Sequence, residues 1–356
     1  MSSRRVFQIL ERATPFLSMD SMDAQAFFAA VARDTAESTP SSHALTQPCV
    51  VALSQLGAIG VEGPDALTFL HAQLTNDVLH QTPEQARLSG FCSHKGRLFA
   101  VFVQRRLPTE SPPGVVLHVE RELAASITKR LSMYVLRSKV RVTDLSNTRV
   151  SFGITFPVGT TGPIDSLPEP FACRYDNDMA TIRLPDALGV ERYLVDVPVE
   201  NAQSLWTTWS SSASIQPASW WDLTQIHAGL ARVTNATVER FVPQMVNFEL
   251  VGGVNFRKGC YPGQEVVARS QYLGKLRRRM FLARVDGLHS LNPGTDIWTQ
   301  GQAVGAVVDA APNLHGGVDA LIETTWADSE SELSVEGRAV VLHALPYEVP
   351  KESSAT

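Results

Sequence analysis

The chain has 356 residues, which is too many for one ordinary hydrophobic core and predicts two or three domains. Hydrophobic residues make up 44% of the chain and charged residues 19%, the proportions of a soluble globular protein. The net charge is −5, and no run of about 18 or more apolar residues occurs, which excludes a helical membrane span.

The cysteines are widely spaced, and none forms a CxxC pair: Cys49, Cys92, Cys173 and Cys260. So few cysteines in so long a chain exclude a disulfide framework, and their spacing is not that of a zinc or iron–sulfur site. We expect a reducing cytoplasm and no permanently bound metal. Glu11 and Asp20 interrupt the N-terminal apolar residues, which excludes a secretory signal; a mitochondrial transit peptide is the weaker alternative, because residues 1–10 are basic and acid-free.

The first two thirds of the chain predict mixed α+β layers. Residues 1–48 begin as a helix and end in a Ser/Thr/Pro-rich segment. Strands and single helices then alternate. Strands are predicted at 49–54, 57–63, 86–92, 97–106, 115–120, 138–145, 149–155 and 191–198. Helices are predicted at 63–78, 121–137, 201–212 and 218–233.

The last part of the chain has a different pattern. Short β-rich segments are separated by Gly, Asn, Pro and Asp, which predicts a small antiparallel barrel or sandwich starting near Arg277. These segments are 281–288, 294–300, 301–311, 317–327 and 337–345.

Basic residues concentrate just before this β-rich part. Residues 251–284 hold eight Lys or Arg against Glu265 alone, and residues 285–356 hold two against eleven acidic residues. The asymmetry indicates either an anionic partner near residues 251–284 or mutual neutralisation of the two segments in the fold.

The same region contains the best candidate for chemistry, NFRKGCYPGQEVVARS at 255–270. A nearby positive charge stabilises a thiolate, and Arg257 and Lys258 can supply it to Cys260. Gly259 and Gly263 permit a sharp turn and close approach of a ligand. The alternative is a buried structural cysteine, since free cysteines are among the most buried residues.

Other chemical motifs are absent. No dinucleotide, P-loop, nucleophile-elbow or HExxH pattern occurs. His71, His94 and His227 are scattered, which favours structural or exposed roles for them. Trp220 and Trp221 favour core packing, with stacking on a flat ligand ring as the alternative.

The motif resembles that of the YgfZ family, folate-binding proteins related to the glycine-cleavage T-protein. The family pattern K-G-C-Y-x-G-Q-E is matched at seven positions, 258–261 and 263–265, and Arg269 and Gly274 fit its continuation. Thr75–Asn76–Asp77 resembles the family's T-N-D turn, and Lys95–Gly96–Arg97 its K-G-R hairpin. The resemblance covers most of residues 50–350.

The resemblance implies a fold of two ferredoxin-like α+β units and a C-terminal antiparallel β-barrel, arranged as a three-domain ring around a folate-sized channel. On this chain we expect an N-terminal extension at 1–48, a first unit at 49–150 and a second at 151–276. The barrel would occupy 277–356. The units would be interleaved, and the cysteine motif would face the channel.

The resemblance also implies a role in assembly or repair of [4Fe–4S] proteins, including radical enzymes that modify tRNA. It implies tetrahydrofolate or a derivative as ligand and iron–sulfur client proteins as partners. Cys260 would be the reactive thiol or a transient cluster ligand, and Lys258 would favour its thiolate. The residues expected to hold the folate are Tyr261, Gly263, Gln264, Glu265, Arg269, Asn76, Asp77 and Lys95.

Two alternatives remain. A folate-dependent aminomethyltransferase needs an acid or base beside the folate nitrogen. The matching positions lack it: the hairpin SHKGR holds no aspartate, and Gln225 and His227 stand in the helix where the T-protein has charged groups. A tRNA-binding accessory protein is suggested by Lys275 and Arg277–Arg279, but few aromatic residues accompany them. We therefore expect an accessory factor with little or no catalysis of its own.

Overall fold

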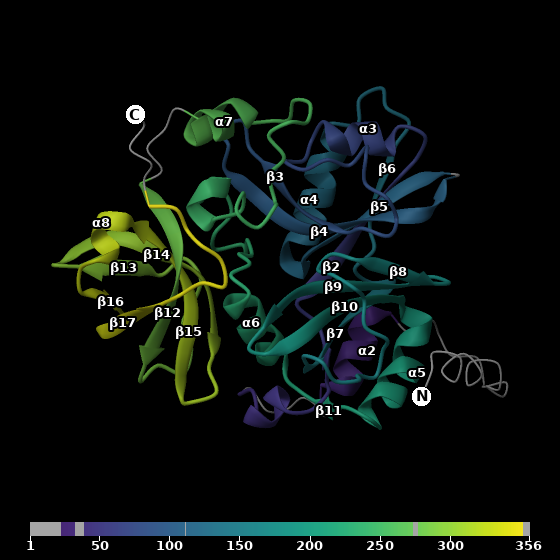
Figure 1. Cartoon of the computed structure of the whole chain (residues 1–356). Helices are drawn as coiled ribbons and strands as arrows, with labels where there is room; N and C mark the ends of the chain where they lie inside the picture. The colour runs from purple at the N-terminus through teal and green to yellow at the C-terminus, as the bar shows by residue number, and fades with distance from the viewer. Residues whose placement is uncertain (1–22, 33–38, 111, 273–276, 352–356) are drawn as a thin grey trace.

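The computed structural model describes residues 23–32, 39–110, 112–272 and 277–351. Gly274, Lys275 and most of the predicted N-terminal helix lie outside these residues. The described part consists of two mainly antiparallel sheets with helices on their faces and a closed barrel beside them (Figure 1). The predicted α+β class with a C-terminal antiparallel barrel is confirmed.

The first sheet has the order β3-β4-β5-β2-β6. Its strands are β2 (Leu56–Glu62), β3 (Arg87–Cys92), β4 (Leu98–Glu110), β5 (Pro113–Glu120) and β6 (Arg141–Asp144). Helix α4 (Arg121–Met133) buries Leu123, Ile127 and Leu131 against it, as their spacing predicted. Helix α3 (Ala66–His71) is much shorter than the predicted helix at 63–78.

The second sheet has the order β11-β1-β7-β10-β9-β8. Its strands are β1 (Cys49–Ala52), β7 (Arg149–Pro157), β8 (Cys173–Asp176), β9 (Met179–Ala187), β10 (Val190–Pro198) and β11 (Ser214–Ile215). Strand β1 therefore pairs with strands from much later in the sequence, and the two sheets are interleaved along the chain. Helices α2 (Ala24–Val31) and α5 (Val199–Ser210) pack on this sheet through Phe27, Trp206 and Trp209.

The barrel closes in the order β12-β15-β14-β13-β16-β17. Its strands are β12 (Arg278–Asp286), β13 (Asp296–Thr299), β14 (Gln302–Pro312), β15 (Gly317–Thr325), β16 (Leu333–Val335) and β17 (Arg338–His343), with α8 (Trp326–Ser329) after β15. Closure removes the exposed strand edges that an open sandwich would leave. Helix α6 (Ala218–His227) lies between the barrel and the second sheet and contacts both (Figure 1).

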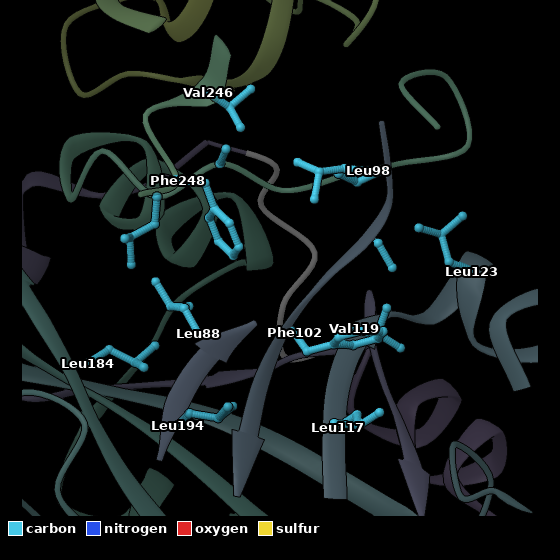
Figure 2. Packing of buried hydrophobic residues seen from close by; sticks show 14 of the residues in the cluster. Leu88, Leu98, Phe102, Leu117, Val119, Leu123, Leu184, Leu194, Val246 and Phe248 are labelled. Atoms are coloured by element: carbon cyan, nitrogen blue, oxygen red, sulfur yellow. The ribbon is translucent and has the colours of Figure 1, made fainter. Parts of the chain in front are cut away.

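One hydrophobic cluster joins all three parts. Figure 2 shows Leu88 and Phe102 of the first sheet near Leu184 and Leu194 of the second, with Phe248 above them. Barrel residues such as Leu282 and Leu321 belong to the same cluster. Each fully buried side chain of this kind contributes about 1.5–3 kcal/mol, so the shared cluster holds the parts together as one structure.

Candidate functional site

The cysteine motif forms an exposed loop at 255–263 followed by α7 (Gln264–Tyr272), next to β3 and the 3₁₀ turn Pro243–Val246. Cys260 is exposed, and the other three cysteines are buried. Burial raises the pKa of the Cys49 and Cys92 thiols to about 12 and that of Cys173 to about 11. Cys260 is therefore the cysteine accessible to a reagent or partner.

The T-N-D turn holds the start of this loop. Thr75 donates its hydroxyl to the carbonyl of Gly253 at 2.6 Å, and its own carbonyl accepts from the Asn255 amide at 2.9 Å. Asn76 donates its side-chain amide to the carbonyls of Leu88 and Gly252, each at 2.7 Å. Asn76, which we expected to bind folate, thus fastens the cysteine loop to β3.

Lys258 closes the end of α3. Its ammonium donates to the carbonyl of Leu74 at 2.8 Å and to that of His71, and it lies 4.9 Å from the centre of the Tyr261 ring. A cation at this point satisfies carbonyls that a helix C-terminus leaves unpaired. Burial lowers the pKa of Lys258 to about 8, against the attraction of Asp77 and Cys260, so the ammonium is retained at pH 7.

A histidine–aspartate cluster lies beside the cysteine loop. Asp77 contacts His71 Nδ1 at 3.1 Å through Oδ1 and His80 Nδ1 at 2.7 Å through Oδ2. A carbon in the Cβ position of Gly259 would lie 3.6 Å from His71 Nε2, so this nitrogen faces the residue next to Cys260. Burial and the Lys258 ammonium lower the pKa of His71, so the ring is neutral at pH 7.

Sequence reasoning missed His71 because no motif marks it; only its place four residues before the T-N-D turn connects the two. Asp77, which we expected to bind folate, contacts His71 and His80, and its assignment to folate stays a prediction. Burial alone would raise the pKa of Asp77, but hydrogen bonds from His80 and the charges of both histidines lower it overall. The carboxylate is therefore ionised and can stabilise a protonated His71.

The K-G-R hairpin packs directly on the start of α7. Gly263 has φ +80°, and a Cβ there would lie 2.3 Å from the carbonyl oxygen of Ser93. Gly96 has φ +70°, and its added Cβ would lie 3.0 Å from Val266. Both glycines are therefore required by the close approach of two backbones. Lys95, which directly precedes Gly96, is exposed on the hairpin.

The remaining motif residues lie around this contact. Tyr261 is 6% exposed, and its hydroxyl is buried without a hydrogen-bond partner in the described part of the chain. Gln264 is half-buried at the first position of α7, and Glu265 and Arg269 are exposed on the same helix. Their assignment to folate stays a prediction.

Several of the basic residues at 251–284 are neutralised within the fold. Arg278 pairs with Glu323 and Arg284 with Asp319 of the barrel, and the buried Arg279 pairs with Glu249. Mutual neutralisation of the two segments therefore explains Arg278 and Arg284, whereas the partner of Arg279, Glu249, lies outside both segments. Arg257, Arg269 and Arg277 are exposed, and Lys275 lies outside the described residues.

A cavity of about 60 Å³ lies where the two sheets, α6 and the segment after it meet. Its apolar walls include Leu88, Leu184, Leu194, Trp221 and Phe248. Its polar lining consists of Gln55, His118, Glu120, Gln225 and Arg232. A water molecule needs about 10–15 Å³ of such space, so the cavity has room for several water molecules or a small ring.

Arg232 is the centre of the polar wall. It contacts Glu120 of β5 at 3.5 Å, Asp222 of α6 at 2.6 Å and Asp309 of the barrel at 2.7 Å. One guanidinium thus joins all three parts at the cavity. Burial raises the pKa of Glu120 to about 7, against the charge of Arg232, so this carboxyl can donate or accept a proton near neutral pH.

The cavity and the cysteine loop are separate features. Phe248 and Val251, just before the motif, line the cavity, whereas none of the described residues 255–272 does. We expected the motif to face a channel, but it does not line this cavity. Of the two residues in the T-protein-like helix, Gln225 lines the cavity, and His227 contacts Asp319 at 2.7 Å.

Trp220 and Trp221 have different roles. Trp220 is fully buried and donates its indole N–H to Thr155 at 3.0 Å, which confirms core packing. Trp221 lines the cavity. Its ring packs directly on Gly153, where an added Cβ would lie only 2.4 Å from it, and the Arg192 guanidinium lies 4.9 Å from the ring centre. Trp221 is thus fixed as a flat wall.

Within the described ranges, no group of three or more His, Cys, Asp or Glu side chains is arranged to hold a metal ion. The helices of those ranges include none with the length and apolar character needed to span a membrane.

Comparison with known proteins agrees with the motif and the fold. No family model matches the chain. It is 28% identical over 251 residues to the tRNA-modifying protein YgfZ of Colwellia psychrerythraea, covering 69% of this chain and 75% of that protein. Aminomethyltransferase T of the glycine cleavage system from Bartonella henselae has a similar structure, with a TM-score of 0.69, 18% identity, and coverage of 85% of this chain and 87% of that one. The chain is therefore similar in sequence to a YgfZ protein, and it has the fold of the glycine-cleavage T-protein.

Proposed function

We propose that the protein is a tetrahydrofolate-binding accessory factor for the assembly or repair of [4Fe–4S] proteins, with Cys260 as its reactive thiol. The observation that carries the proposal is the exposure of Cys260 alone among the four cysteines, on a loop held beside His71 and Asp77. The similar YgfZ protein is named as a tRNA-modifying protein, which suits clients that include tRNA-modifying radical enzymes.

His71 is the group suited to take the thiol proton. The proton of Cys260 passes to His71 Nε2, directly or through one water molecule, while Asp77 stabilises the resulting imidazolium. Lys258 carries its own proton at pH 7 and cannot accept another. The thiolate then attacks a disulfide or persulfide of a partner, breaking that S–S bond and forming a new one to Cys260, so no further oxidant is needed.

Tetrahydrofolate suits the cavity. Its pterin is flat and carries N–H and carbonyl groups, and the cavity combines the flat Trp221 wall with a polar lining of Gln55, His118, Glu120, Gln225 and Arg232. Gln55, His118, Glu120 and Arg232 would hold the ring, and the bound folate would supply a carrier for one-carbon units. Arg269 and Lys95 remain candidates for its anionic tail.

Replacement of Cys260 by serine or alanine is expected to abolish rescue of aconitase-type and tRNA-thiolating activities in a bacterial strain that lacks its own homologue. The substituted site is exposed, so the urea midpoint should match that of the unmodified protein, which separates loss of the thiol from loss of the fold. Full rescue by either variant would remove Cys260 from the mechanism.

A large side chain that fills the cavity is expected to block the binding of tetrahydrofolate. Ala231 lines the cavity and is 4% exposed, so Ala231→Phe should weaken tetrahydrofolate binding at least tenfold in calorimetric titration. Ala303→Phe, at an exposed position of β14, is the matched control and should bind normally. Equal binding by both variants would place the folate elsewhere.

One observation favours the alternative of aminomethyl transfer. The hairpin lacks the aspartate of the T-protein, but Glu120 lines the cavity and could serve as the acid or base in its place. Burial raises the pKa of this carboxyl to about 7. Formation of methylene-tetrahydrofolate from an aminomethyl donor would distinguish the two functions. The accessory factor predicts no turnover above background.

A further inference from the structure

The surface around Cys260 carries cations that the fold does not neutralise. Lys95 lies on the hairpin, Arg257 in the cysteine loop and Arg269 on α7, and all three are exposed. None of them forms an ion pair with a described residue, in contrast to the arginines of β12, which pair with barrel carboxylates. The motif itself contains a single acid, Glu265. The surface therefore has a net positive charge available to a partner.

The backbone places these charges within electrostatic reach of the Cys260 thiol. Arg257 precedes Cys260 by three residues, so their Cα atoms lie at most about 11 Å apart. Gly263 follows Cys260 by three residues and packs on the hairpin, where its added Cβ would lie 2.7 Å from the Cα of Gly96, the residue after Lys95. The Debye length is about 10 Å at 0.1 M salt and about 30 Å at 0.01 M, so an anion that approaches the thiol is attracted by these cations.

Exposed apolar side chains accompany the cations. Val266 of α7 is 38% exposed and lies over the hairpin at Gly96, whose added Cβ would be 3.0 Å from it. Tyr272, at the end of the same helix, is 68% exposed and packs edge-to-face on Phe256, with 5.8 Å between the ring centres. A polypeptide buries aliphatic and aromatic side chains alike, whereas RNA recognition relies on aromatic stacking. The combination of Val266 with the cations therefore favours an acidic polypeptide as the partner.

We propose that Cys260 exchanges with cysteines that lie in acidic segments of partner proteins, and that Lys95, Arg257 and Arg269 attract those segments to the thiol. This inference rests on the proposed function of Cys260 as a reactive thiol and adds the chemical class of its partner. The Cys260 thiolate attacks the partner's disulfide, one S–S bond breaks as another forms, and the departing thiolate takes up the proton that Cys260 gave up. Because the cations act on approach, they raise the rate of this exchange.

Two short peptides that differ only in charge provide the test. In one, a cysteine is flanked on each side by two aspartates, and in the other by two asparagines of the same shape. Both are activated as 2-pyridyl disulfides, which release a neutral, light-absorbing thione when the Cys260 thiolate attacks the peptide sulfur. The full-length protein should react about tenfold faster with the aspartate peptide at an ionic strength of about 0.01 M, and this preference should disappear at about 1 M. N-acetylcysteinamide, a thiol without neighbouring cations, should not prefer the aspartate peptide, and Cys260→Ala gives the background rate.

Variants assign the preference to the three cations. Lys95→Gln, Arg257→Gln and Arg269→Gln combined should bring the ratio of the two rates close to one, and the ratio cancels any change in the thiolate fraction. Arg338→Gln is the matched control, because this exposed arginine lies on β17, well apart from α7 (Figure 1).

Equal rates for the two peptides, or an unchanged ratio in the triple variant, would overturn the inference. If the triple variant then lost affinity for tetrahydrofolate or tRNA, the cations would belong to that anion instead. A thiol that reacted with neither peptide above the Cys260→Ala background would refute the proposed function of Cys260 itself.

Discussion

Replacement of Asp196 by alanine is expected to destabilise the protein by about 3–5 kcal/mol, the cost of removing one partner from a buried ion pair. Asp196 is fully buried on β10 and contacts Arg105 of β4 and, at 2.8 Å, Arg149 of β7. The side chains of these arginines are 1% and 11% exposed, so the variant would leave two cations in the interior without this carboxylate.

Chemical unfolding in urea measures this loss as a lower midpoint. Asp178→Ala is the matched control, because Asp178 contacts the same Arg149 at 3.1 Å but is 71% exposed. Exposed pairs contribute about 1 kcal/mol or less. Similar midpoints for the two variants would show that Asp196 does not carry the ion network.

Replacement of Gly263 by alanine is expected to displace α7 and to cost about 3 kcal/mol. The left-handed backbone accounts for about 1–2 kcal/mol of this, and overpacking against the Ser93 carbonyl and the Gly96 backbone for about 1–3 kcal/mol. Hydrogen exchange of residues 255–272 should accelerate, because the hairpin could no longer hold the start of the helix.

Gly189→Ala provides the comparison for backbone strain alone. Gly189 has φ +75°, and an added Cβ would meet no described atom within 4 Å. Its variant should lose about 1 kcal/mol and leave exchange at 255–272 unchanged. If Gly263→Ala behaved in the same way, the close packing of hairpin and helix would not matter for the cysteine loop.

The sequence predicted the features of the fold and the site that depend on residues close together in the chain. The barrel was recognised from short strands and regular turns, α4 from its apolar spacing, and the cysteine loop from a contiguous motif. The helix at 63–78 was predicted too long because the apolar spacing of Leu67, Leu70 and Leu74 continues past His71, where the backbone turns and Lys258 caps the helix. That cap comes from a distant part of the chain.

The remaining features of the site could not be predicted, because they depend on contacts between residues that are far apart in sequence. The polar wall of the cavity combines Gln55, His118, Glu120 and Arg232, which no local pattern connects. His71 becomes relevant only through Gly259, and the charges of Arg278 and Arg284 are neutralised by barrel residues. The contacts of Asn76 with the segment before the cysteine loop and of Asp77 with His71 and His80 also join residues that no local pattern connects.

The place of β1 has a consequence for assembly during synthesis. Cys49 pairs with Thr155 of β7 and Ser214 of β11, so this strand leaves the ribosome long before its neighbours. Until β7 and β11 are made, β1 is an unpaired apolar segment. Without β1, the second sheet has a gap between β7 and β11. A strand from a second copy fits that position as well as the chain's own, so refolding at high protein concentration should favour strand-exchanged dimers, which a truncation before residue 56 cannot form because it removes the strand.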